Sequence, residues 1–284
     1  MPGSPAPRDL LRPTADEAAE AWAARVRAGR EQIERLREID EPPDFYGPMA
    51  QRFAQDPRRV DDPALEALRR LARPEATWLD IGAGGGRYSL PLASAVRRMH
   101  AVEPSPSMLQ VLRDGMRTYG IEGIEVHPGA WPGAGGKVRA DVALMAHVGY
   151  DIEPFGAFLD AAEAAASRCV VIMRTSSGVR ASHLLWPEVH GESRVAYPML
   201  PELLVLLVAR GRVPAITLVE RGAWGDPSPQ ALLASMRRML WLRPGSDKDR
   251  HLQALIEERA SEREGGWELD WTPMQDGVVT WSVR

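Results

Sequence analysis

The chain has 284 residues, of which 44% are hydrophobic and 26% charged, with a formal net charge of -4. A chain of this length buries a large core in one α/β domain or in one domain with additions. The slight acidity gives no basic field for nucleic acid, and the single cysteine, Cys169, excludes an internal disulfide framework. No apolar run resembles a signal peptide or approaches the roughly 20 residues that span a bilayer. We therefore expect a cytoplasmic protein that binds neither nucleic acid nor a membrane.

The first sixty residues are predicted to be helical and to lie outside the main domain. Apolar residues recur at helical spacing over 15–39, behind a capping-box pair formed by Thr14 and Glu17. A second, short helix is predicted at 49–54. We expect residues 1–60 to form a lid over the functional site or a contact with a second subunit, so that the protein is a monomer or a homodimer.

From residue 61 onward, predicted strands alternate with predicted helices. The strands are expected at 77–81, 100–103, 124–127, 141–146 and 168–173. The helices are expected at 63–71, 88–96, 107–119 and 154–166. This alternation is typical of parallel βαβ units in a doubly wound sheet.

The remainder of the chain is expected to complete the sheet and to add a cap. Two further strands are predicted at 215–222 and 278–283, and further helices at 181–186, 199–209, 228–241 and 247–262. The predicted fold is an α/β, Rossmann-like, doubly wound and mostly parallel seven-stranded sheet. The sheet domain would span 61–284, with helical insertions at about 176–212 and 226–264.

A glycine cluster follows the first predicted strand. Glycine at a strand-to-helix turn lets the backbone approach a ligand closely. A dinucleotide-binding loop has the pattern G-x-G-x-x-G; counted from Gly82, its last glycine would fall on Arg87, so that pattern fails. The segment instead fits D-x-G-x-G-x-G through Asp80, Gly82, Gly84 and Gly86.

An acidic residue ends the second predicted strand, about 20 residues beyond the glycine turn. Glu103 stands in the run VEPSPSML, which spans residues 102–109. A carboxylate at this place can accept hydrogen bonds from both hydroxyls of a ribose.

Together the two segments resemble those of the class I S-adenosylmethionine-dependent methyltransferases, in particular the Rossmann-like small-molecule methyltransferases. The resemblance covers roughly residues 77–174. In that family the glycine loop passes beneath the methionine part of the cofactor, and the acid of the first strand lies near its amino group. The resemblance implies a methyltransferase with S-adenosylmethionine as cofactor and S-adenosylhomocysteine as product. The cofactor-binding residues that it implies are Asp80, Gly82, Ala83, Gly84, Gly86, Glu103, Pro104, Ser105 and Met108.

Two further landmarks of the family are expected after the third and fourth strands. The loop after the third strand lacks the acid that usually meets the adenine amino group, so the backbone of Ala130 and the ring of Trp131 are expected there instead. The fourth strand ends at Ala146, where such enzymes face the transferable methyl group. A hydroxyl acceptor needs a base, and His147 is the candidate catalytic residue, against the alternative that it only packs there.

The candidate substrate contacts are Tyr46, His147, Tyr150 and Trp186. For Trp186 the alternative is ordinary packing within the cap. His183, Glu188 and His190 have no compact metal-ligand spacing, so we expect no metal.

The acceptor class remains open among three hypotheses. A small-molecule acceptor methylated on O, N or C is favoured. RNA or protein methylation is a second hypothesis, although the fourth strand lacks the Asn/Asp-Pro-Pro-Tyr sequence of amino-methylating nucleic-acid enzymes. The third is a cofactor-binding module that does not catalyse a reaction.

Overall fold

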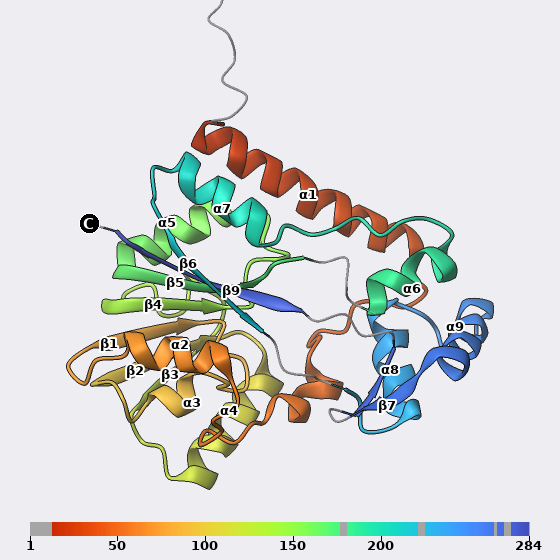
Figure 1. Cartoon of the computed structure of the whole chain (residues 1–284), viewed down its shortest axis with the longest axis horizontal. Helices are drawn as coiled ribbons and strands as arrows, with labels where there is room; N and C mark the ends of the chain where they lie inside the picture. The colour runs from red at the N-terminus through yellow and green to blue at the C-terminus, as the bar shows by residue number, and fades with distance from the viewer. Residues whose placement is uncertain (1–12, 177–180, 221–224, 264–265, 270–273, 284) are drawn as a thin grey trace, which may run out of the picture.

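Residues 13–176, 181–220, 225–263, 266–269 and 274–283 are described by the structure, a computed structural model. Its main strands are β1 (Thr77–Ile81), β2 (Arg98–Glu103), β3 (Ile124–Pro128), β4 (Ala140–Ala146), β5 (Ala166–Arg174), β6 (Ala215–Glu220) and β9 (Gln275–Ser282). They form one seven-stranded sheet in the order β3-β2-β1-β4-β5-β9-β6 (Figure 1). Only β9 runs antiparallel to its neighbours in this sheet. The predicted mostly parallel, seven-stranded α/β fold is confirmed.

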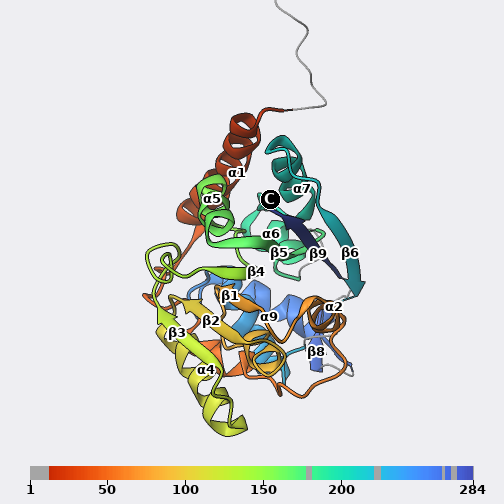
Figure 2. The same ribbon diagram turned by 90° about the vertical axis from the view of Figure 1, so that its left-hand side faces the viewer.

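Helices cover both faces of the sheet (Figure 2). One face packs against α1 (Ala15–Leu36), α5 (Phe155–Ala165) and α7 (Leu200–Ala209). The other face packs against α2 (Pro63–Leu71), α3 (Ser89–Leu92) and α4 (Pro106–Tyr119). All five residues of β1 are buried. Because strand side chains alternate between faces, Leu79 and Ile81 enter the first core and Trp78 the second.

The N-terminal helix is fastened to the segment that follows β4. The Trp22 ring stacks on Phe155 at a centroid distance of 4.4 Å. Its Nε1 donates a 3.0 Å hydrogen bond to the carbonyl of Ile152. Arg27 forms a 2.6 Å ion pair with Glu153. Helix α1 therefore covers the chain just beyond the carboxyl end of β4.

The cap lies beyond the carboxyl ends of the parallel strands, on the right in Figure 1. It contains α6 (Ala181–His190), α8 (Pro229–Met239) and α9 (Asp247–Arg259), and a hairpin of β7 (Ser261–Arg263) and β8 (Gly266–Glu268). These elements share their own hydrophobic cluster. A 3-10 helix, η1 (Gly47–Phe53), contacts the cap. Its Arg52 forms a 2.6 Å ion pair with Asp226, which lies just before α8.

Several predicted boundaries differ from the observed ones. The helix predicted at 88–96 is only the short α3, because the chain turns toward β2. The helix predicted at 247–262 ends at Arg259, and the hairpin of β7 and β8 that follows was not predicted. Strands of three residues are too short to show the alternation of apolar and polar residues by which a strand is predicted. Positions 221 and 222 of the strand predicted at 215–222 lie outside the described residues. Within the described part of the chain, none of the helices is both long and apolar enough to cross a membrane.

Candidate functional site

The turn after β1 is built from glycines in the left-handed region. The φ angles of Gly82, Gly84 and Gly86 are 77°, 56° and 86°, which side chains rarely adopt. A Cβ on Gly82 would lie 2.4 Å from Val148 Cγ2, so the loop contacts the segment after β4. A Cβ on Gly84 would meet nothing within 4 Å. The turn therefore leaves open space beside Gly84, and a ligand can approach its backbone.

Asp80 is a buried carboxylate with one unsatisfied oxygen. Its Oδ2 accepts a 2.6 Å hydrogen bond from Ser89 Oγ, whereas its Oδ1 is buried and has no hydrogen-bond partner among the described residues. Burial raises the pKa of Asp80 to about 7, opposed by the Ser89 hydrogen bond and assisted by the charge of Glu103. A buried acceptor without a partner is costly. An ammonium group would satisfy Oδ1 and keep the carboxylate ionised.

Glu103 links the glycine loop to the start of α4. It is 5% exposed, and its carboxylate accepts 2.8 Å hydrogen bonds from the backbone N–H groups of Gly84 and Ser105. Burial raises the pKa of Glu103, and these two hydrogen bonds oppose the shift. Asp80 is thus the penultimate residue of β1 and Glu103 the last residue of the neighbouring strand β2, close enough for the charge of Glu103 to act on Asp80.

The start of α4 is held from the N-terminal segment. Ser105 caps this helix by accepting a hydrogen bond from the N–H of Met108 at 3.2 Å. The Asp44 carboxylate accepts further bonds from Ser105 Oγ and the Ser107 N–H. Met108 is buried in a small cluster with Ala50 of η1. Residues of the N-terminal segment therefore border Ser105 and Met108. Pro104, which connects Glu103 to α4, is exposed.

The loop after β3 lies beside the end of β2. The Gly129 N–H donates a 2.9 Å hydrogen bond to the carbonyl of Glu103, and Ala130 and Trp131 follow directly. Ala130 is exposed, and the Trp131 ring packs against the sheet core. Within the described part of the chain, Trp131 Nε1 is buried without a hydrogen-bond partner. The two residues predicted to meet adenine thus adjoin Glu103.

His147 follows Ala146 at the carboxyl end of β4 with φ at 58°. Its Nδ1 lies 3.2 Å from the Tyr150 hydroxyl, which accepts a 3.1 Å hydrogen bond from the N–H of Arg174. If Tyr150 donates its hydroxyl proton to Nδ1, a neutral His147 carries its own proton on Nε2. Nε2 lies 3.5 Å from Oδ2 of Asp276, which is 3% exposed. The imidazole stands between a phenol and a buried carboxylate.

The remaining two predicted substrate contacts lie apart from this group. Tyr46 is 41% exposed and precedes η1, where its ring meets Phe53 edge to face. Trp186 is 1% exposed in the hydrophobic cluster of the cap, and its ring lies 4.2 Å from that of His190. The Arg194 guanidinium also lies over this indole, 4.5 Å from the ring centroid. Trp186 is thus enclosed by cap residues.

Asp44, Ser89 and Asp276 are polar residues of the site that sequence analysis missed. Ser89 stands nine residues after Asp80 and has no motif of its own. Asp44 and Asp276 lie near opposite ends of the chain. Only the folded sheet brings Asp276 beside His147, so no local sequence signal could have identified it.

Solved structures with the same fold include several methyltransferases. A SAM-dependent methyltransferase from Thiobacillus denitrificans in complex with S-adenosyl-L-homocysteine is 14% identical, with a TM-score of 0.53, over 87% of this chain and 100% of that one. A putative methyltransferase from Bacillus halodurans is 12% identical, with a TM-score of 0.51, over 77% of this chain and 98% of that one. No protein-family model and no curated protein matches the sequence. The fold is that of class I S-adenosylmethionine-dependent methyltransferases.

Proposed function

We propose that this protein is an S-adenosylmethionine-dependent methyltransferase that acts on a small molecule. The observation that carries the proposal is the buried Asp80 Oδ1, which lacks a partner among the described residues beside a glycine loop open at Gly84. The amino group of the cofactor supplies the cation that this oxygen requires. A pyrophosphate at the same place would be repelled by the carboxylate.

The other cofactor contacts follow from the geometry of the loop. Glu103 faces Gly84 and would accept hydrogen bonds from the ribose hydroxyls. Ser105 and Met108 at the start of α4, with Ala130 and Trp131 in the loop after β3, would enclose the adenine. When bound, the cofactor supplies an activated methyl group on a sulfonium, so this chain mainly has to orient the partners and exclude water.

His147 is the proposed base for an acceptor hydroxyl. Its Nδ1 would take the proton by way of the Tyr150 hydroxyl, which would pass its own proton to Nδ1 and receive that of the acceptor. Asp276 faces the opposite nitrogen and would stabilise the imidazolium that forms. The left-handed backbone of His147 supports a functional role, because a side chain in that region is strained.

A cover over the site would favour a small acceptor. We infer that residues 13–60, the described part of the predicted segment 1–60, act as this cover, because α1 fastens the chain after Tyr150 and Asp44 fastens the start of α4. The formal net charge of -4 gives no general attraction for a nucleic acid.

The test is isothermal titration of the full chain with S-adenosylmethionine and S-adenosylhomocysteine, followed by a screen of small hydroxyl, amine and carbon acceptors. We expect one site per chain with micromolar affinity. The affinity should fall by at least about 100-fold, the effect of removing two charged hydrogen-bond partners, in the Asp80→Ala, Glu103→Ala variant. Asp247→Ala, whose side chain is 96% exposed on α9, is the matched control. A folded wild type that binds neither compound contradicts the proposal, and binding without turnover on any acceptor favours a non-catalytic module.

A further inference from the structure

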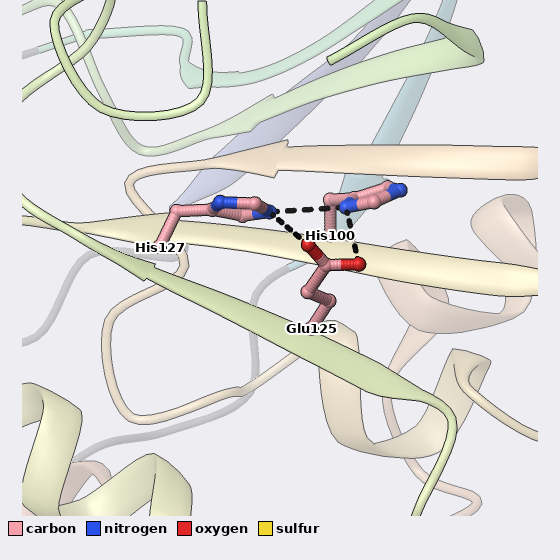
Figure 3. Close-up of side chains that lie close together, drawn as sticks. All are labelled: His100, Glu125 and His127. Atoms are coloured by element: carbon pink, nitrogen blue, oxygen red, sulfur yellow. Dashed lines mark hydrogen bonds and ion pairs between the residues drawn. The ribbon is translucent and has the colours of Figure 1, made fainter. Parts of the chain in front are cut away.

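We propose that His100, Glu125 and His127 form a binding site for one divalent transition-metal ion of the zinc type (Figure 3). The three side chains belong to two adjacent parallel strands, β2 and β3. His100 pairs directly with Glu125, and His127 lies two residues further along β3. Because alternate residues of a strand share a face, all three side chains stand on the same face of the sheet. Figure 3 shows the imidazoles and the carboxylate converging.

The donor atoms already have the separations that a small metal ion imposes. His100 Nδ1 lies 3.0 Å from His127 Nε2. Glu125 Oε2 lies 3.6 Å from His100 Nδ1, and Oε1 lies 3.7 Å from His127 Nε2. With one ligand atom taken from each residue, the three atoms lie within 4.8 Å of one another. Tetrahedral zinc, with bonds of about 2.0–2.1 Å, holds its ligand atoms about 3.3–3.4 Å apart. Side-chain shifts that bring one Glu125 oxygen close to both nitrogens would therefore complete the coordination.

The donor set defines the class of metal. Two imidazoles and one carboxylate suit zinc, cobalt, nickel or copper, whereas magnesium and calcium prefer sets of oxygen donors. Three protein ligands leave a fourth position for water. The side chains of His100 and His127 are 11% and 21% exposed, and that of Glu125 is 50% exposed. The strands hold the imidazoles in place, and the carboxylate side stays open to ions from solvent.

One cation already competes for the carboxylate. Arg98 Nη1 lies 3.2 Å from Glu125 Oε2, and this arginine side chain is 61% exposed. The oxygen nearer to His127 is Oε1, so a metal can bind through Oε1 while Arg98 keeps Oε2. Such an outer partner would orient the carboxylate rather than displace the metal. Without a metal, the same residues form a hydrogen-bonded chain. The experiment must therefore distinguish a metal site from this chain of hydrogen bonds.

A bound ion would tie the edge of the sheet to its interior. Among the described strands, β3 lies at the edge of the sheet and pairs with β2 alone. A ligand that binds the folded chain but not the unfolded chain stabilises the fold. The ion would thus add a crosslink where the sheet has only one row of backbone hydrogen bonds. This site is separate from Asp80 and the glycine loop, and the inference does not depend on the proposed methyl transfer.

The experiment is zinc titration of the tag-free, chelator-treated full chain by calorimetry, with Co²⁺ absorption spectroscopy in parallel. We expect one ion per chain, a dissociation constant in the micromolar range or below, and the visible bands of tetrahedral Co²⁺. Zinc at 100 times its dissociation constant should raise Tm on the order of 5 °C. Magnesium at the same concentration should leave Tm unchanged.

Three variants assign the binding to these residues. His127→Gln and Glu125→Gln should each weaken zinc binding on the order of 100-fold and abolish the cobalt bands. His251→Gln removes an exposed histidine from α9 and should bind as the wild type does. If His127→Gln does not fold, the half-exposed Glu125→Gln carries the test alone. Binding below one ion per chain, or equal binding by the wild type and Glu125→Gln, overturns the proposal and leaves only the hydrogen-bonded chain.

Discussion

The Asp44 carboxylate accepts hydrogen bonds from Ser105 Oγ at 2.8 Å and from the Ser107 N–H at 3.0 Å, which joins the segment before η1 to the first turn of α4. Partial burial opposes ionisation, but the hydrogen bonds from Ser107 and Ser105 hold the pKa of Asp44 below its usual value. An anion at this position also complements the positive end of the helix dipole. The side chain therefore acts as a second N-cap supplied from outside the helix.

Asp44→Ala should lower the free energy of unfolding by about 1 kcal/mol, the usual value of a helix cap. It should also weaken S-adenosylhomocysteine binding, because the Ser105 hydroxyl loses the carboxylate that fixes its orientation. Since the folded pKa of Asp44 is depressed, its stabilisation is present above the unfolded pKa and lost as the pH falls below it. Urea unfolding at pH 7 measures the effect. Asp40→Ala, with a side chain 98% exposed, should stay within about 0.5 kcal/mol of the wild type.

The pH should control cofactor affinity through Asp80. Burial raises the pKa of Asp80 to about 7. The Ser89 hydrogen bond lowers this pKa, and the charge of Glu103 raises it further. The cofactor ammonium requires the ionised carboxylate, so S-adenosylhomocysteine should bind about tenfold more weakly for each pH unit below 7. Calorimetry between pH 5 and pH 8 tests this. An affinity independent of pH over that range would show that Asp80 does not face the ammonium.

Asp80→Asn should separate stability from binding. A folded pKa above the unfolded one means that the native state holds an extra proton, and stability falls as the pH rises from about 4 to about 7. The neutral amide removes this cost, so the ligand-free variant should be more stable at pH 8, by at most about 4 kcal/mol. It should also lose most of its cofactor affinity. Ser89→Ala, which removes the hydrogen bond from Ser89 Oγ to the Asp80 carboxylate, should destabilise the protein instead.

His147→Gln should reduce kcat for a hydroxyl acceptor by about 100-fold or more, while KM changes little. Asp276→Asn should lower kcat in the same direction, because it removes the charge that faces His147 Nε2. The double variant should be little worse than His147→Gln, since the two residues act as a unit. Additive losses would show that Asp276 acts independently of His147. Cofactor titration of each variant checks that binding is retained.

Glu163→Ala should strongly destabilise the fold. The buried carboxylate accepts bonds from Arg210, Arg212 and Trp281 Nε1 at 2.8–3.0 Å. Burial opposes ionisation, yet these partners lower the pKa of Glu163, so its stabilisation is lost only as the pH falls below the ordinary glutamate range. Its removal takes the acceptor from a buried indole N–H and from Arg212, and leaves Arg210 with Asp160 alone, which should cost about 3 kcal/mol in urea unfolding. Asp160→Ala, which leaves Arg210 paired with Glu163, should cost less than about 1 kcal/mol.

Local signals account for what sequence analysis predicted well. The strand at Thr77–Ile81 was predicted with its observed bounds, because a short and mostly apolar run directly precedes a glycine turn. The capping box of Thr14 and Glu17 is present at the start of α1. Asp80 and Glu103 were predicted at the ends of the first two strands and lie there, at or next to the last residue, because a distinctive motif follows each of them.

Pairings between distant residues could not be predicted in this way. The convergence of His100 with His127 depends on the register of β2 against β3, and a shift of one residue would turn one side chain to the other face. The approach of Asp276 to His147 depends on β9 lying beside β5. Helix α1 was predicted to reach residue 39 but ends at Leu36, since the Glu38 N–H donates to the carbonyl of Trp241 in the cap. These contacts are set by tertiary structure.

The position of β9 has a consequence for biosynthesis. In the seven-stranded sheet β6 pairs with β9 alone, and β9 fills the gap between β5 and β6. Strand β6 ends at Glu220, whereas β9 begins at Gln275, so a ribosome adding about 5–20 residues per second needs roughly 3–11 s to deliver the missing strand. During that interval the edges of β5 and β6 lack their partner, and Ile216 and Leu218, 44% and 55% exposed even in the finished fold, stand on an unpaired edge. Until β9 emerges, the nascent chain therefore exposes strand edges that are prone to aggregate.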